Sequence, residues 1–125
     1  MPFSQQHGIG VLCWSPLASG FLTDGFDLES LDPQDFRRRR PLAQEPAFAK
    51  LRELWRLLQT IAQDHRKKMA DVAIAWVLRQ PAVTGAIIGI RNEREAREMP
   101  GGLNWKLTEQ ELQDIEQALE LLGIG

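Results

Sequence analysis

Residues 9–16 read Ile-Gly-Val-Leu-Cys-Trp-Ser-Pro, a short apolar run that ends at a proline. Such a run is typical of a strand buried on both faces, as in a parallel sheet. Pro16 has no backbone N–H for a ladder, so we expect the strand to occupy about residues 9–15. Residues 84–90, Thr-Gly-Ala-Ile-Ile-Gly-Ile, form a second candidate of the same kind. With the helices described next, these runs predict an α/β fold with a parallel sheet.

Four further segments carry the signs of helices. Apolar residues that recur every three or four positions predict an amphipathic helix after the first strand. The segment that follows it is apolar nearly all round, and its alanines and Asp71 favour a well-covered helix over a strand. Thr108-Glu-Gln-Glu111 forms a capping box before the last apolar stripe. The predicted helices cover residues 46–64, 70–79, 93–99 and 109–122.

The number of elements disagrees with the composition. With 43% hydrophobic and 26% charged residues, the 125-residue chain has the composition of one globular domain. Only two strands are visible, however, and a two-stranded parallel sheet is not a self-sufficient core. Residues 17–45 are predicted as a loop, and loops of that length are usually lids, binding loops or disordered. We therefore expect an incomplete fold.

Charge and cysteine content exclude several classes of protein. The net charge of −2 excludes a globally basic nucleic-acid binder, and the lone Cys13 excludes a disulfide framework and a cysteine zinc cluster. His7 and His65 have no ligand spacing, so we expect no metal site. For the basic run 37–40 we favour a solvated loop face over one arginine on a cofactor phosphate, and both over nucleic acid. No apolar run is long enough for a membrane span and no signal peptide is visible, so we expect a cytoplasmic protein without membrane partners.

Three stretches, in this order, resemble the C-terminal part of the aldo-keto reductases. Residues 14–22 are similar to the family's seventh barrel strand and the loop that leaves it. Residues 71–78 are similar to the helix before the last strand. Residues 87–92, with Glu95 and Glu98, are similar to the eighth strand and the start of the nucleotide-binding helix. The Trp-Ser-Pro-Leu form is most similar to the bacterial reductases related to potassium-channel β subunits.

This resemblance, which runs from about Gly8 to Leu121, implies a fold and an activity. The family is a (β/α)₈ TIM barrel that transfers hydride between NADPH and an aldehyde or ketone. A barrel of this class needs roughly 200–250 residues or more. Residues 1–125 would therefore supply the C-terminal portion of a barrel, its last two β/α units, and would be incomplete alone.

The resemblance also implies roles for residues that follow the first strand. Trp14 matches an aromatic residue that stacks on the nicotinamide ring. Ser15, Leu17 and Ser19 match positions around the pyrophosphate, and Gly20 permits close approach of the backbone there. The complete set of candidate cofactor-binding residues is Trp14, Ser15, Pro16, Leu17, Ser19, Gly20, Gly89, Arg91, Glu95 and Glu98.

The remaining candidates match the adenosine end of the cofactor. Gly89 and Arg91 occupy these positions, and the Arg91 guanidinium suits the 2′-phosphate of NADP. Glu98 matches an acid that binds the adenine amino group.

Two positions depart from the residues that are usual in the family. Glu95 stands where Gln or Arg is frequent, and a carboxylate is poorly placed for a phosphate, while Met99 stands where Asn is usual.

No catalytic residue can be assigned. The family uses Asp, Tyr, Lys and His, all in earlier strands and their loops, and this sequence contains no tyrosine. We expect the chain to be inactive alone, since it lacks the general acid. It would be completed by a missing N-terminal barrel portion, by a second polypeptide or by self-association, and the complete enzyme would take a small carbonyl substrate. A non-catalytic NADP-sensing or protein-interaction module is the alternative, and an unrelated helical protein a third.

Overall fold

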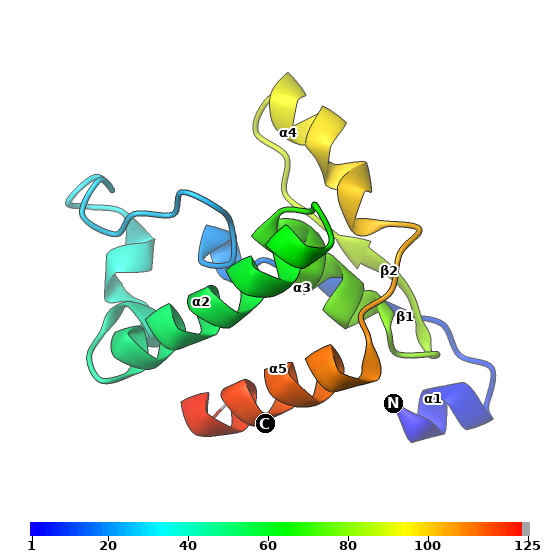
Figure 1. The fold of residues 1–125 in the computed structure, drawn as a ribbon. Helices are drawn as coiled ribbons and strands as arrows, with labels where there is room; N and C mark the ends of the chain where they lie inside the picture. The colour runs from blue at the N-terminus through cyan, green and yellow to red at the C-terminus, as the bar shows by residue number, and fades with distance from the viewer. Residues whose placement is uncertain (124–125) are drawn as a thin grey trace.

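The computed structural model describes residues 1–123. It has a small sheet, five α-helices and four short 3₁₀ helices within that range (Figure 1). In chain order the elements are α1 (Pro2–Gln6), β1 (Val11–Trp14), η1 (Ala18–Gly20), η2 (Phe36–Arg39), η3 (Pro41–Ala43), α2 (Ala47–Asp64), α3 (Met69–Leu78), β2 (Val83–Ile87), α4 (Glu93–Glu98), η4 (Met99–Gly102) and α5 (Glu109–Leu122).

The two strands pair in parallel, as the apolar runs predict. Leu12 lies opposite Gly85 and Trp14 opposite Ile87. The chain reaches the second strand through α2 and α3, a crossover that parallel pairing requires. One face of the sheet is open: the side chains of Leu12, Trp14 and Ile87 are 63%, 80% and 56% exposed. Within residues 1–123 each strand also has one edge that pairs with no other strand.

Both strands are shorter than the sequence predicts. The expected strand over 9–15 is Val11–Trp14, and the one over 84–90 is Val83–Ile87. The reason is the turn after β1: Ser15 has a φ of 58°, which takes the chain out of the extended conformation. The Ser15 N–H still donates to the Ile87 carbonyl at 3.3 Å. Beyond that bond β1 no longer runs beside residues 88–90, so they have no strand to pair with. The prediction that the second strand extends to residue 90 was therefore wrong.

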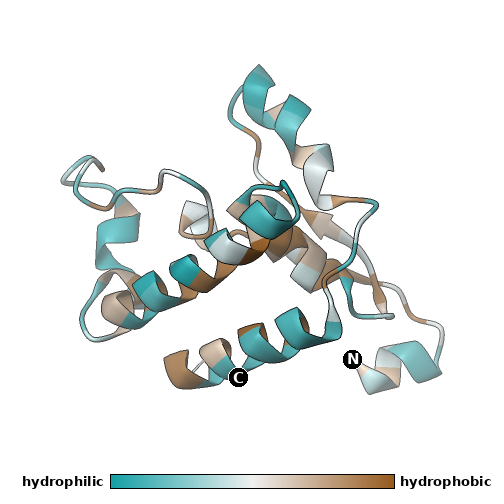
Figure 2. Ribbon diagram, in the orientation of Figure 1, coloured by the Kyte–Doolittle hydropathy of each residue, from teal (hydrophilic) through white to brown (hydrophobic). Residues whose placement is uncertain are grey.

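The core lies between three helices. α2 packs against both α3 and α5 (Figure 1). Its period of three and four places one stripe inward, and the outward surface is hydrophilic (Figure 2). α3 is covered along most of its length and also contacts β2. The buried residues at the centre of this core are Phe21, Leu51, Leu54, Leu58, Ile61, Ala62, Met69, Val72 and Ile115.

The long segment after β1, expected as a loop over 17–45, is ordered by contacts with the core and by side-chain bonds. Phe21 is fully buried, and its carbonyl accepts a hydrogen bond from Trp55 Nε1 at 2.6 Å. The Arg38 guanidinium donates to the carbonyls of Glu29 and Leu31 at 2.9 Å and 2.7 Å. Arg40 donates to Ser19 Oγ at 3.1 Å. The basic run 37–40 is therefore more than a solvated face, because Arg38 and Arg40 donate hydrogen bonds that hold the loop in place.

The start of α5 is stabilised by a carboxylate with partners on two elements. The Thr108 N–H donates to Glu111 Oε2 at 2.8 Å, as the capping box predicts, and His65 Nε2 lies 2.8 Å from Glu111 Oε1. Burial by itself would raise the pKa of Glu111. The hydrogen bonds from Thr108 and His65 outweigh burial, so the pKa of Glu111 lies below its usual range.

The lowered pKa of Glu111 predicts a contribution to stability that depends on pH. A depressed folded-state pKa contributes stability above the unfolded value, and this is lost as the pH falls through the folded value. We expect Glu111→Gln to be less stable than the unmodified chain at about pH 6, with the difference shrinking towards about pH 3. Urea unfolding at both pH values measures it. Glu109→Gln, an exposed residue of the same turn, is the control, and an equal pH response in both variants would contradict the prediction.

Candidate functional site

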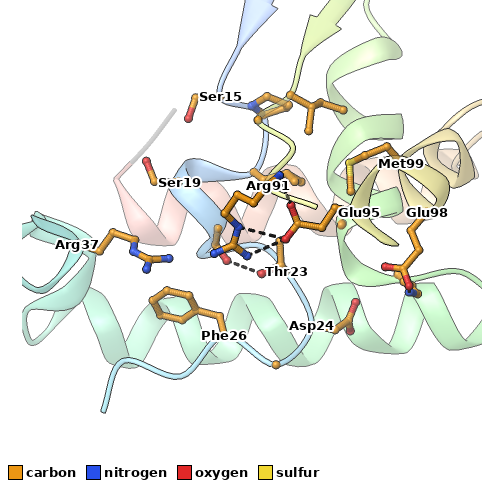
Figure 3. A pocket seen from close by; sticks show the side chains of 18 of the residues that line it. Ser15, Ser19, Thr23, Asp24, Phe26, Arg37, Arg91, Glu95, Glu98 and Met99 are labelled. Atoms are coloured by element: carbon orange, nitrogen blue, oxygen red, sulfur yellow. Dashed lines mark hydrogen bonds and ion pairs between the residues drawn. The ribbon is translucent and has the colours of Figure 1, made fainter. Parts of the chain in front are cut away.

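A cavity of about 1060 Å³ lies at the carboxyl ends of β1 and β2 (Figure 3). One wall is the turn after β1, over residues 14–20, and a second is the loop between η1 and η2. The third wall runs from the end of β2 through α4, and residues at the start of α3 close the lining. This volume is that of a small-molecule site, and the carboxyl ends of parallel strands are the usual place for one.

The turn after β1 has an unusual backbone. Ser15, Ala18 and Ser19 have φ angles of 58°, 49° and 61°, and Gly20 has a φ of 94°. Left-handed conformations of residues other than glycine cost free energy and gather at functional sites. Leu17, between Ser15 and Ala18, has φ −96° and ψ 12°, so the backbone changes hand within the turn. The N–H groups of Ser15, Ala18 and Gly20 already donate to the carbonyls of Ile87, Ser15 and Leu17. The hydroxyls of Ser15 and Ser19, rather than a row of N–H groups, are therefore the donors that this turn offers to an anion.

Arg91 and Glu95 form an ion pair on the opposite wall. Arg91 Nη2 and Nε lie 2.8 Å and 3.1 Å from Glu95 Oε1, and the Arg91 N–H donates to Oε2 at 2.8 Å (Figure 3). The Arg91 side chain is 78% exposed but that of Glu95 only 17%. The guanidinium and backbone N–H of Arg91 lower the pKa of Glu95. The carboxylate is thus held in place at the start of α4.

The other cationic side chains that line the cavity also face carboxylates. Lys68 Nζ lies 2.8 Å from Glu98 Oε1, and Arg94 Nε lies 3.8 Å from the same oxygen. The contact with Lys68 lowers the pKa of Glu98. On the loop, Arg37 forms an ion pair with Asp35, and this side-chain contact lowers the pKa of Asp35 to about 2. The cavity therefore contains fixed charges of both signs.

All of the candidate cofactor-binding residues border this one cavity, although they come from two segments nearly seventy positions apart. These are Trp14, Ser15, Pro16, Leu17, Ser19 and Gly20 from the first segment, and Gly89, Arg91, Glu95 and Glu98 from the second. The resemblance implies that these residues share one cofactor site, and the fold brings them to the lining of one cavity. Met99 borders the cavity too.

Sequence reasoning missed the part of the lining that comes from the loop and from α3. Thr23, Asp24 and Phe26 border the cavity from the loop, and Asp71 borders it from α3. Asp24 Oδ2 accepts from the N–H of Met69 at 2.9 Å, which satisfies a free donor at the start of α3. Asp24 lies 45 positions before that helix, so no local pattern identifies the contact.

Two further observations concern other kinds of site. In residues 1–123, no group of three or more His, Cys, Asp or Glu side chains is placed to hold a metal ion. His65 contacts Glu111, while His7 lies against the ring of Phe3 with 4.3 Å between ring centroids. Over the same range, none of the helices has the length and apolarity needed to cross a bilayer.

The fold and site define an α/β unit with a ligand-sized cavity at the carboxyl ends of two parallel strands. The model of the aldo/keto reductase family matches residues 1–120. The chain therefore belongs to the aldo/keto reductase family, which confirms the resemblance found in the sequence.

Curated relatives and a solved structure agree with this assignment. The chain is 28% identical to aldo-keto reductase str7 of Strobilurus tenacellus, over 94% of this chain and 35% of that protein. It is 29% identical to aldo-keto reductase yakc [NADP(+)] of Schizosaccharomyces pombe, over 96% of this chain and 36% of that protein. The glycerol dehydrogenase of Gluconobacter oxydans matches with a TM-score of 0.86 and 26% identity, over 99% of this chain and 38% of that one. The chain thus spans about a third of the length of these curated relatives.

Proposed function

We propose that this chain is the cofactor-binding, C-terminal part of a (β/α)₈ barrel oxidoreductase that transfers hydride between NADPH and an aldehyde or ketone. The observation that carries the proposal is the convergence of residues 14–20 and 89–98 on one cavity at the strand ends. The name of the Schizosaccharomyces pombe relative includes NADP(+), which supports this cofactor. The match to 38% of the Gluconobacter oxydans enzyme supports the partial barrel.

The residues of the cavity fit a nicotinamide nucleotide. Its volume of about 1060 Å³ suits a ligand of that size. Ser15 and Ser19, whose hydroxyls can donate to a pyrophosphate, border the cavity in the turn after β1. Arg37, which is paired with Asp35, lies on the same side. Trp14, which is 80% exposed, presents an aromatic surface that suits a planar, partly cationic ring.

Each part of the chain then has a defined task. The bound nucleotide would supply the hydride. Trp14 orients its nicotinamide ring, and the turn over residues 15–20 positions the diphosphate. Arg91 and Glu95 contact the adenosine end, where Glu98 is available to the adenine amino group. No residue of this chain is assigned to proton transfer, so the acid that completes reduction belongs to the rest of the barrel.

A protein-interaction module is the second candidate, and the open sheet face favours it. Leu12, Trp14 and Ile87 are exposed on a parallel sheet, a kind of sheet that is normally covered on both faces. Strand edges without partners are ready templates for pairing with another chain. The missing barrel strands or a second copy of this chain would cover them.

We expect NADPH to shift one indole signal in a nitrogen–proton correlation spectrum of the chain. Trp14 borders the cavity, whereas Trp55, Trp76 and Trp105 do not. Because a stacked ring alters the shielding of the indole beneath it, the Trp14 signal should move while the other three stay in place. Titration with NADPH measures the effect, and Trp14→Phe identifies the signal. A spectrum in which no indole moves at saturating NADPH would contradict the proposal.

A further inference from the structure

The ion pair between Arg91 and Glu95 bears on which nucleotide the cavity accepts. Glu95 accepts hydrogen bonds from three N–H groups of Arg91: the backbone amide, Nε and Nη2, at 2.8–3.1 Å. The Glu95 N–H donates to Asn92 Oδ1 at 2.9 Å, which fixes the backbone at the start of α4. The side chain of Glu95 is thus held by the protein itself, in a position that borders the cavity.

This arrangement opposes a phosphate at Arg91. A guanidinium binds a phosphate best through two parallel N–H groups. Here the edge formed by Nε and Nη2 faces the Glu95 carboxylate, which leaves only the Nη1 side of the Arg91 guanidinium to an incoming anion. A phosphate would have to displace the Glu95 carboxylate or approach it as a second anion. The lowered pKa of Glu95 keeps that carboxylate charged at neutral pH. A hydroxyl in the same place meets no such cost, because it can donate a hydrogen bond to a carboxylate, as it does in other dinucleotide sites.

We propose that Glu95 sets the choice between phosphorylated and unphosphorylated nucleotide by occupying the Arg91 guanidinium and by accepting a hydrogen bond from a ribose 2′-hydroxyl. NADPH is then accepted but not strongly preferred over NADH. The inference rests on the proposed function, since it takes the cavity to hold a nicotinamide nucleotide with its adenosine end at Arg91.

The test is a comparison of NADPH and NADH binding by isothermal titration calorimetry. The unmodified chain should bind the two with affinities within about threefold of each other. Glu95→Gln should raise the ratio of NADPH to NADH affinity by about fivefold to tenfold, because it frees the guanidinium and removes the competing charge. Glu95→Asp should shift the ratio in the same direction by less, since a carboxylate one methylene shorter reaches the guanidinium poorly.

Glu93→Gln is the matched control. Glu93 forms an ion pair with Arg97 on the same helix, both side chains are more than three-quarters exposed, and neither borders the cavity. The substitution removes the same charge from α4 and should leave the ratio unchanged. In the Arg91→Gln variant, a further Glu95→Gln substitution should no longer raise the ratio of NADPH to NADH affinity. This double-mutant comparison distinguishes an effect of the Arg91–Glu95 pair from an effect of the overall charge of the cavity.

The outcomes separate this inference from the proposed function. If neither nucleotide binds the unmodified chain, the proposed function is wrong and the inference is overturned with it. If both bind but Glu95→Gln leaves the ratio unchanged, or Glu93→Gln raises it equally, only the role of Glu95 is overturned. A preference of the unmodified chain for NADPH of more than about fiftyfold would also overturn it, because Arg91 would then bind phosphate despite Glu95.

Discussion

The purified 125-residue chain is expected to reduce aldehydes and ketones with NADPH at least about a hundredfold more slowly than a complete aldo-keto reductase. A positioned general acid contributes roughly 10²–10⁴ to such a reaction. The sequence has no tyrosine to act as that acid. The carboxylates of Glu95 and Glu98 border the cavity, but Arg91 and Lys68 lower their pKa values. They are deprotonated at neutral pH and cannot donate the proton.

Consumption of NADPH with a panel of aldehydes and ketones measures this rate. The glycerol dehydrogenase of Gluconobacter oxydans, assayed with its own substrate, is a suitable complete relative for comparison. Binding of NADPH is followed on the same preparation through the Trp14 signal, so that a low rate is not confused with an empty cavity. Turnover within tenfold of the complete enzyme would show that these 125 residues contain a proton donor after all.

The helices of this chain are largely readable from local patterns. The amphipathic period predicts a helix over 46–64, and α2 is Ala47–Asp64. The capping box predicts the start of the last helix, and α5 is Glu109–Leu122. In both cases the signal is contained within the helix itself, because one stripe of apolar residues and the residues at its ends decide it.

Other features depend on residues far apart in the sequence and were missed for that reason. β2 ends at Ile87 because β1 turns away at Ser15, seventy-two positions earlier. The loop after β1 is held by Trp55 and by the contact of Asp24 with the start of α3. The helix α1 has only five residues, too few for any period to show, although Pro2 suits a helix start.

Part of the lining of the candidate site could be read from the sequence, but the pairing of its charges could not. The resemblance to a family identified ten residues, and all of them border the cavity. The spacing of Arg91 and Glu95 is i,i+4, which permits an ion pair on a helix. The pair instead straddles the start of α4, where the Arg91 backbone N–H also takes part. That third hydrogen bond, which fixes Glu95, depends on the backbone conformation and is not visible in the sequence.

Replacing Gly102 by alanine is expected to lower the free energy of unfolding by about 2 kcal/mol. Gly102 is buried in η4, and a Cβ there would lie 2.7 Å from both Cβ and Cγ2 of Ile74. Ile74 is 1% exposed in the middle of α3, and its Cβ cannot rotate away. Alanine also restricts the unfolded chain, which stabilises by about 0.4–1 kcal/mol, but overpacking costs about 1–3 kcal/mol and prevails.

Urea unfolding measures the change, with Gly89→Ala as the control. A Cβ at Gly89 meets no atom within 4 Å, so that variant should differ from the unmodified chain by less than about 0.5 kcal/mol. Equal stability of the two variants would show that η4 does not pack on α3 as described.

The packing of η4 on α3 also affects the cavity, because η4 continues directly from α4. Lys67 Nζ donates to the Gly101 carbonyl of η4 at 2.9 Å. The contact of Gly102 with Ile74 thus anchors the helix that carries Glu95 and Glu98, and a loss of that contact should weaken NADPH binding as well as stability.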